Sequence, residues 1–139
     1  METFILDTDI NVLCVTAKSF PDGIMEAFDE LHSFVPFTES RRLFVISRPN
    51  KLGVIVYKAA FEELHQGEPE KFGCESFVIQ HGKYIYVDRT DYAKDMQSIG
   101  EAFHLLISQP NIDSNGYCLE WYLNGKDVRC MVRIDDIKN

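Results

Sequence analysis

The chain has 139 residues, of which 45% are hydrophobic and 26% are charged, and its formal net charge at pH 7 is −8. This length and composition predict one soluble globular domain. The acidic balance argues against direct nucleic-acid binding, which needs clustered Lys and Arg, because the 14 basic residues are scattered. No apolar run approaches the roughly 20 residues of a membrane-spanning helix. Residues 1–4 have no basic segment typical of a signal peptide, so we expect a cytoplasmic protein without membrane contact.

Four cysteines are spread along the chain without the Cys-x-x-Cys spacing of zinc sites and redox motifs: Cys14, Cys74, Cys118 and Cys130. Without a secretory signal such cysteines are typically reduced, so we expect buried or half-buried thiols on strands. No metal and no cofactor are expected from the sequence.

The first half of the chain predicts the order strand–helix–strand–strand. β-Branched residues favour the first strand, apolar side chains at helical spacing indicate the helix, and Pro36 ends it. Asp22, within the interruption Pro21-Asp22-Gly23, is a plausible helix N-cap. The predicted ranges are 10–20 for the first strand, from residue 24 for the helix, and 43–47 and 54–61 for the strands that follow.

The second half repeats this order after a polar segment. Gly82 inside the next strand indicates a bulge or bend, Pro110 ends the second helix, and an Asn-Gly pair at 124–125 is a strong hairpin signal. The predicted ranges are 77–87, 117–122 and 128–134 for strands and 95–109 for the helix. We therefore divide the single domain into a first repeat over about 4–63, a linker over 64–74 and a second repeat over about 75–137.

The repeat is visible in residues as well as in pattern, at a constant offset of 75 positions. The same offset equates Val45 with Glu120, so an apolar side chain in one half corresponds to a carboxylate in the other. It also equates Ser47 with Tyr122. The matching helix residues are Ile24, Glu26, Ala27, Phe28, Leu31 and Ser33 with Ile99, Glu101, Ala102, Phe103, Leu106 and Ser108.

Glu120 interrupts an otherwise apolar and aromatic strand. Strand alternation puts it on one face with Cys118 and Tyr122, while Leu119 and Trp121 point the other way. From residue type alone, the carboxylate either faces solvent, or pairs with Arg129 or Arg133, or lies in a pocket. In a pocket, desolvation would raise its pKa above the usual value of about 4.3.

Four motifs in this order, spanning almost the whole chain, resemble the gyrase-inhibitory-protein-like small-molecule-binding family, which includes the effector-binding domains of multidrug-responsive AraC- and MerR-type transcription regulators. The resemblance implies an α+β fold of two β-α-β-β units related by pseudo-two-fold symmetry. It implies one curved antiparallel sheet with helices packed on it and a concave central cleft. The motifs are Ser19-Phe20-Pro21-Asp22-Gly23, Gly53-Val54-Ile55-Val56-Tyr57-Lys58-Ala59, Val78-Ile79-Gln80-His81-Gly82-Lys83-Tyr84 and Leu119-Glu120-Trp121-Tyr122.

The resemblance also implies that the cleft binds flat, hydrophobic and often cationic compounds between aromatic rings. Glu120 would then be the counter-charge, with Tyr57 and Tyr122 as aromatic walls. Other aromatic residues could also line the cleft, although aromatic side chains on strands usually pack in the core or across strands. These further candidates are Tyr86, Trp121 and Phe20.

The sequence leaves three functions open. The first is a binding protein that senses or sequesters a small molecule, with a possible role in transcription regulation. The second follows from family members that hydrolyse strained cyclopropane-bearing electrophiles: Glu120 would act as general base or orient a water, and Tyr57 would donate a proton. The third is a gyrase-inhibitor-type interaction protein, so a regulator or gyrase is a possible protein partner.

The chain departs from the family pattern in two ways. Members often end the last strand with Pro, whereas here Val132-Arg133-Ile134 continues to Asp135-Asp136. No DNA-binding segment precedes the repeats, so we do not expect a complete transcription factor.

Overall fold

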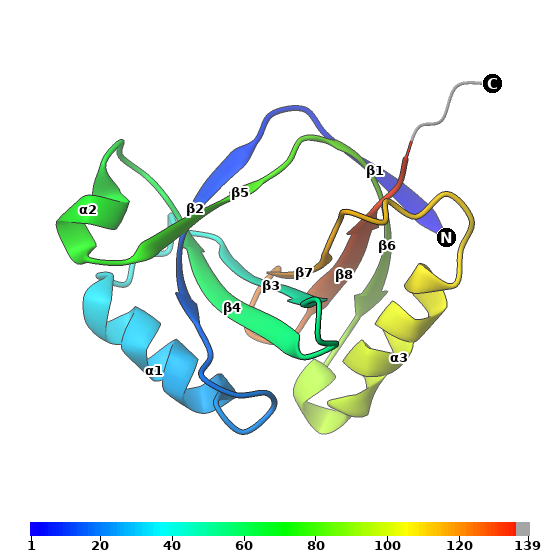
Figure 1. The fold of residues 1–139 in the computed structure, drawn as a ribbon, viewed down its shortest axis with the longest axis horizontal. Coiled ribbons are helices and arrows are strands. Elements are labelled where there is room, and N and C mark those ends of the chain that lie inside the picture. The colour runs from blue at the N-terminus through cyan, green and yellow to red at the C-terminus, as the bar shows by residue number, and fades with distance from the viewer. Residues whose placement is uncertain (136–139) are drawn as a thin grey trace.

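The structure, a computed structural model that describes residues 1–135, is one eight-stranded antiparallel sheet with helices packed on it (Figure 1). The predicted α+β class is confirmed. The predicted end of the second repeat at 137 and Asp136 lie outside the described residues. In chain order the elements are β1 (Glu2–Leu6), β2 (Ile10–Thr16), α1 (Ile24–Phe34), β3 (Leu43–Pro49), β4 (Ile55–Glu62), α2 (Glu68–Phe72), β5 (Glu75–Ile79), β6 (Gly82–Arg89), the 3-10 helix η1 (Tyr92–Lys94), α3 (Gln97–Ile107), β7 (Cys118–Tyr122) and β8 (Val128–Arg133).

Each half of the chain has the order β-β-α-β-β, which is one strand more than predicted. In the first half the additional strand is β1. In the second half, the strand predicted over 77–87 is divided into β5 and β6. The division lies at the predicted bend, where Gly82 has a φ of 137°. This conformation favours glycine, and a Cβ there would also come within 2.9 Å of the Arg133 guanidinium.

The strand order β1-β6-β8-β7-β3-β4-β2-β5 places corresponding strands at equal distances on either side of the central β3–β7 pair. Across that pair, Val45 is the Cα partner of Glu120. These are the two residues that the offset of 75 equates. Equivalent residues that face each other across an antiparallel pair lie on the two-fold axis, so Glu120 lies at the centre of the sheet.

The outermost strands are exchanged between the halves. β1 pairs with β6 from the second half, with Phe4 opposite Tyr84, and β5 pairs with β2 from the first half. Because β1 leads into β2 and β5 into β6, the two connections lie side by side at the top of the curled sheet in Figure 1. The exchange joins the two halves into a single unit.

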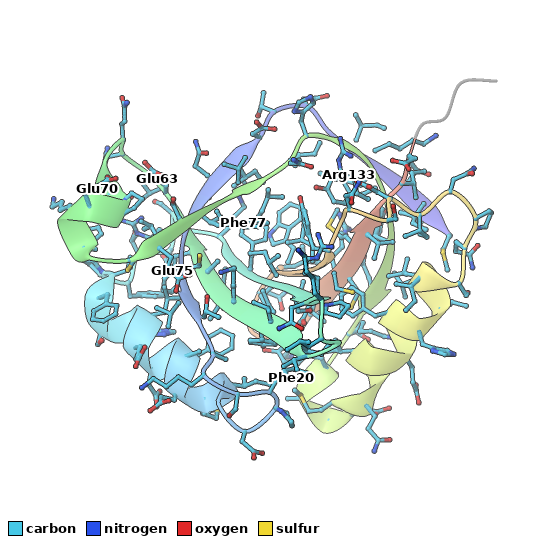
Figure 2. All side chains as sticks on the ribbon, in the orientation of Figure 1. Phe20, Glu63, Glu70, Glu75, Phe77 and Arg133 are labelled. Atoms are coloured by element: carbon cyan, nitrogen blue, oxygen red, sulfur yellow. The ribbon has the colours of Figure 1, made fainter. Side chains whose placement is uncertain are left out.

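The inside of the curl is filled by apolar side chains, among them Phe77 of β5, which Figure 2 shows pointing inward. The two long helices pack on the outside of the curl, each over a separate apolar cluster, and they leave the central strands uncovered between them (Figure 1). All four cysteines are free thiols on or beside strands, as predicted. The inner cluster comprises Ile10, Val12, Cys14, Phe44, Ile46, Ala60, Ile79, Tyr84, Tyr117, Leu119 and Met131.

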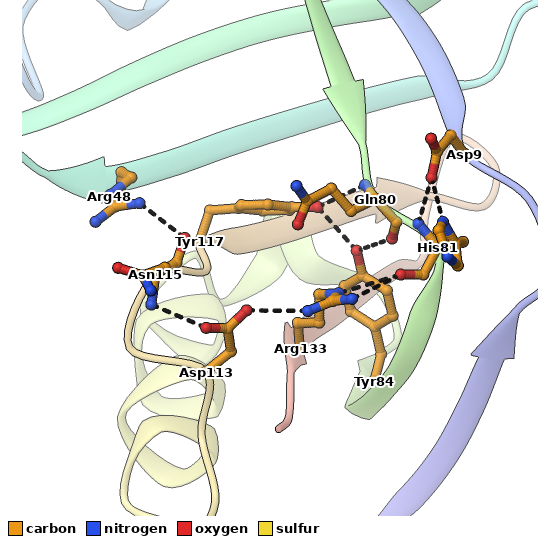
Figure 3. Close-up of polar contacts among 9 residues, drawn as sticks. All are labelled: Asp9, Arg48, Gln80, His81, Tyr84, Asp113, Asn115, Tyr117 and Arg133. Atoms are coloured by element: carbon orange, nitrogen blue, oxygen red, sulfur yellow. Dashed lines mark hydrogen bonds and ion pairs between the residues drawn. The ribbon is translucent and has the colours of Figure 1, made fainter. Parts of the chain in front are cut away.

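A polar network holds the β1–β2 and β5–β6 connections together (Figure 3). The backbone N–H of His81 donates to the carboxylate of Asp9 over 2.8 Å, and the His81 ring lies 2.6 Å from the same oxygen. The hydroxyl of Tyr84 donates to the Gln80 carbonyl, and the Gln80 N–H donates to the hydroxyl of Tyr117. These contacts satisfy the backbone groups that the break between β5 and β6 leaves without a ladder partner.

Two local predictions are wrong. Asp22 does not cap α1, because the cap residue is Gly23 and no side chain bonds to the helix end. The first strand ends at Thr16 rather than at residue 20, so Phe20 lies in the turn before α1, next to the cis Phe20–Pro21 peptide bond. Within residues 1–135, no helix is long and apolar enough to cross a membrane.

The linker predicted over 64–74 contains the short helix α2, held by an ion pair. The Arg41 guanidinium contacts both carboxylate oxygens of Glu68 over 2.8 Å each, and both side chains are buried. The backbone N–H of Leu64 also donates to Glu68.

Candidate functional site

A cleft of about 580 Å³ lies between α1 and α3, on the face of the sheet that carries the helices. Its floor is formed by the central strands, so the two-fold axis passes through it. The cleft is central, as expected, but it opens outward between the helices, whereas the concave inside of the sheet is filled by the inner cluster. The lining residues are Phe20, Ile24, Met25, Phe28, Leu43, Ser47, Ile55, Tyr57, Tyr92, Met96, Ile99, Gly100, Phe103, Cys118, Glu120 and Tyr122.

Glu120 on β7 is the carboxylate of the cleft, and only 7% of its surface is exposed. The Tyr122 hydroxyl donates a hydrogen bond of 2.5 Å to its Oε1 atom. Across residues 1–135, no Lys, Arg or His lies within ion-pair distance of it. Burial raises the pKa of Glu120 to about 7, although the bond from Tyr122 acts in the opposite direction. The carboxylate therefore lies in a desolvated position without a counter-charge from the part of the chain that the structure describes.

The pairing of Glu120 with Arg129 or Arg133, left open by the sequence, does not occur. Arg129 lies opposite Trp121 in the β7–β8 pair and thus on the other face of the sheet, where it bonds to Asp88 over 2.8 Å. Arg133 bonds to Asp113 over 3.1 Å.

Aromatic rings from both halves of the chain form the walls. Phe20, which Figure 2 shows between the two helices, packs against Tyr57 with the ring centroids 5.5 Å apart. On the other side, the rings of Tyr92 and Tyr122 meet edge to face at 5.3 Å. Burial, and secondly the charge of Glu120, raise the pKa of both Tyr57 and Tyr122. Both phenols thus remain protonated at neutral pH, and the cleft presents neutral rings around one carboxyl group.

The structure brings four of the six candidate residues together in the cleft and leaves two outside it. Trp121 packs against Phe4 and Phe44 on the other face of the sheet. The Tyr86 ring lies there as well, with the Arg129 guanidinium 4.1 Å from its centroid. The cause is strand alternation, which turns Trp121 away from Glu120. The residues found in the cleft are Glu120, Tyr57, Tyr122 and Phe20.

Several lining residues had no signal in the sequence. Tyr92 belongs to a single 3-10 turn, which has no hydrophobic periodicity. Met96 is the residue before α3, and Gly100 lies inside α3 without a side chain that could contribute to a periodic pattern. Strand alternation did indicate Cys118, whose thiol has its pKa raised to about 11 by burial and then by the charge of Glu120.

The donor set of the cleft is one carboxyl group, phenol and alcohol hydroxyls and one thiol. Among the residues that the structure describes, no three His, Cys, Asp or Glu side chains are arranged to hold a metal ion. The remaining chemical possibilities for Glu120 are to attract a cation, to accept a hydrogen bond or to take up a proton.

No family model matches the sequence, and no curated protein matches it. Solved structures do match over almost the full length. They include the protein SAV2435 bound to tetraphenylphosphonium, at a TM-score of 0.70 and 12% identity, covering 98% of this chain and 95% of that one. The fold is shared.

Two further structures have the same arrangement. An integron cassette protein from the mobile metagenome of Vibrio cholerae matches at a TM-score of 0.69 and 11% identity, over 96% of this chain and 95% of that chain. A hydrolase from Listeria innocua matches at a TM-score of 0.64 and 10% identity, over 96% of this chain and 90% of that one. At these identities the likeness establishes the fold alone.

Proposed function

We propose that this protein binds a hydrophobic, cationic small molecule in the cleft between α1 and α3. Glu120 is the counter-charge, and Tyr57, Tyr122 and Phe20 are aromatic walls. The observation that carries the proposal is the buried carboxyl group of Glu120, which opens onto the cavity and has no basic partner in residues 1–135.

The physics of this site favours a cation. A positive charge about 4 Å from the carboxylate gains roughly 4 kcal/mol at an effective dielectric constant near 20. Each ring face adds cation–π attraction of about 0.5–2 kcal/mol. A poorly hydrated organic cation loses little hydration on entering the cleft, so most of this attraction remains. The cation also supplies the partner that a buried carboxylate otherwise lacks.

The size and lining of the cleft support the same conclusion. A volume of about 580 Å³ is within the range of roughly 300–1,000 Å³ that is usual for drug-sized ligands. Most lining side chains are apolar or aromatic. SAV2435, which shares the fold, was solved with tetraphenylphosphonium, a cation whose charge is surrounded by four phenyl rings. That this chain binds a cation of the same kind is part of our proposal.

Calorimetry and thermal unfolding with tetraphenylphosphonium test this function directly. Binding to the native state alone should raise the melting temperature, by an amount equivalent to about 2.7 kcal/mol at a ligand concentration 100 times Kd. Glu120→Gln keeps the size and hydrogen-bonding capacity of the side chain but removes the charge, and it should abolish most of the shift. Triphenylphosphine oxide, a neutral compound with similar rings, is the control ligand and should bind both proteins weakly. Equal binding of tetraphenylphosphonium to both proteins would contradict the proposal.

A hydrolytic activity at the same cleft is the second candidate. The observation in its favour is the pKa of Glu120, about 7, which is suited to a general base at neutral pH. Its test is turnover of an electrophilic cyclopropane substrate, with loss of turnover in Glu120→Gln. Absence of turnover in the wild-type protein under conditions where tetraphenylphosphonium binds would leave binding as the function.

A further inference from the structure

The two helices that wall the cleft contribute corresponding residues, with one exception. Ile24 and Phe28 of α1 are equivalent to Ile99 and Phe103 of α3 at the offset of 75, and all four line the cleft. The third lining position on each helix differs: α1 has Met25, and α3 has Gly100.

The fold itself does not require a glycine at position 100. The residue lies inside α3, is exposed, and has no unusual φ. A Cβ placed there would meet no heavy atom within 4 Å. A glycine inside a helix makes the protein less stable than an alanine would, because glycine gives the unfolded chain more conformational freedom and adds no side-chain packing to the helix. The missing side chain therefore adds volume to the cleft at the expense of helix stability.

The additional volume lies in the half of the molecule that contains the charge. Glu120 and Tyr122 belong to β7 in the second half, whereas the equivalent first-half residues are Val45 and Ser47. Tyr122 packs in the apolar cluster beneath α3. The space beside Gly100 on the α3 wall is thus next to the half of the floor that carries Glu120. On the α1 wall the 71%-exposed, flexible thioether of Met25 can fold over a ligand instead.

We propose that Gly100 determines which cations the cleft accepts: its bare backbone admits an aryl group attached to the charged centre itself. The cleft then prefers cations whose charge is encased in aryl groups over slim cations that have a single ring. This inference rests on the proposed function, because it assumes a cation beside Glu120. It goes further by naming the class of cation and the residue that selects it.

The test compares the affinity of a bulky and a slim cation, tetraphenylphosphonium and benzyltrimethylammonium, in wild type and variants by calorimetry. Gly100→Leu should raise Kd for tetraphenylphosphonium about tenfold or more, and Kd for benzyltrimethylammonium by less than about threefold. A matched control introduces the same leucine elsewhere on α3. His104→Leu is at an exposed position outside the cleft. It should retain the wild-type ratio of the two Kd values.

Gly100→Ala is the milder variant and separates steric exclusion from misfolding. It should raise the melting temperature of the unliganded protein by about 2 to 5 °C while still weakening tetraphenylphosphonium binding more than benzyltrimethylammonium binding. An unchanged ratio of the two Kd values in both Gly100 variants would overturn the inference and leave the proposed function standing. If the wild-type protein binds neither cation, both are overturned.

Discussion

Two carboxylates are buried among residues 1–135, and their surroundings differ. Glu68, 3% exposed, lies in α2 and accepts two hydrogen bonds from the Arg41 guanidinium and one from the Leu64 N–H. These hydrogen bonds lower the pKa of Glu68 to about 2, against the effect of its burial. Glu120, 7% exposed, accepts one bond from a tyrosine and has its pKa raised to about 7 by burial. Two carboxylates with similarly low exposure thus have pKa values shifted in opposite directions.

The comparison shows that burial of a charge does not by itself indicate its role. Glu68 has a partner within the fold and no need of another, so its role is to hold α2 against the sheet. Glu120 faces a cavity and has no basic partner within residues 1–135, and in the proposed function a cation from solution completes the site. Substitutions at and around these two residues test this division of roles.

The largest expected effect is on stability, at the Arg41–Glu68 pair. Arg41→Met leaves a buried carboxylate without a cation and should lower the free energy of unfolding at pH 7 by about 3–5 kcal/mol. Urea unfolding measures it. The control is Lys18→Met, which removes an exposed contact of 4.0 Å to Glu26 and should cost less than about 0.5 kcal/mol. Tetraphenylphosphonium affinity, measured well below the melting temperature, should be unchanged in Arg41→Met. A stability loss as small as that of the control would mean that the buried pair is not structural.

A smaller effect is expected in the pH dependence of stability at Glu120. Its pKa is about 7 in the folded protein and near the usual 4.5 in the unfolded chain. Between these values the native state binds more protons, so stability should fall as pH rises from about 4.5 to 7. Glu120→Gln removes this decline. The free energy of unfolding of the variant, relative to that of wild type, should therefore increase by on the order of 3 kcal/mol between pH 4.5 and pH 8. Parallel pH profiles for the two proteins would show that Glu120 titrates normally. For Glu68 the pH dependence of stability has the opposite sign. Its contribution to stability is present above pH 4.5 and is lost as pH falls toward 2, because its pKa is lowered in the folded protein.

The smallest expected effect is on tetraphenylphosphonium affinity, when aromatic residues on the two faces of the sheet are replaced. Tyr57→Leu removes a ring from the wall of the cleft and should weaken tetraphenylphosphonium binding by about 1 kcal/mol, or roughly fivefold. Tyr86→Leu is the matched change on the other face, where the ring contacts Arg129, and should leave the affinity unchanged. Calorimetry measures both. If Tyr86→Leu weakens binding as much as Tyr57→Leu, the ligand does not occupy the cleft.

Most of the architecture could be predicted from sequence. Both long helices and the strands β3, β4, β7 and β8 follow from local periodicity and from Pro and Gly positions. The exchange of β1 and β5 between the halves could not, because it depends on pairing between distant segments. The buried ion pair of Arg41 and Glu68 could not be predicted either, because α2 is a five-residue helix in a polar stretch.

The candidate site was partly predictable. The internal repeat identified Glu120 as a residue that the fold does not require, and the structure places its equivalent, Val45, directly opposite. Alternation along β7 was already sufficient to exclude Trp121 from the face of Glu120. Tyr92 and Gly100 were not found, because one lies in an irregular turn and the other contributes by having no side chain.

The most direct test of the account is the affinity for tetraphenylphosphonium at pH 6 and pH 8, measured by calorimetry in wild type and Glu120→Gln. Three further titratable side chains of the cleft, those of Tyr57, Tyr122 and Cys118, remain protonated over this range because their pKa values are raised. With a pKa of about 7 for Glu120, the ionised fraction increases about tenfold between the two pH values. We predict that Kd falls about tenfold in wild type and that Glu120→Gln binds weakly at both pH values. Wild-type affinity that is independent of pH, or equal affinity in the variant, would contradict the role of Glu120 as the counter-charge.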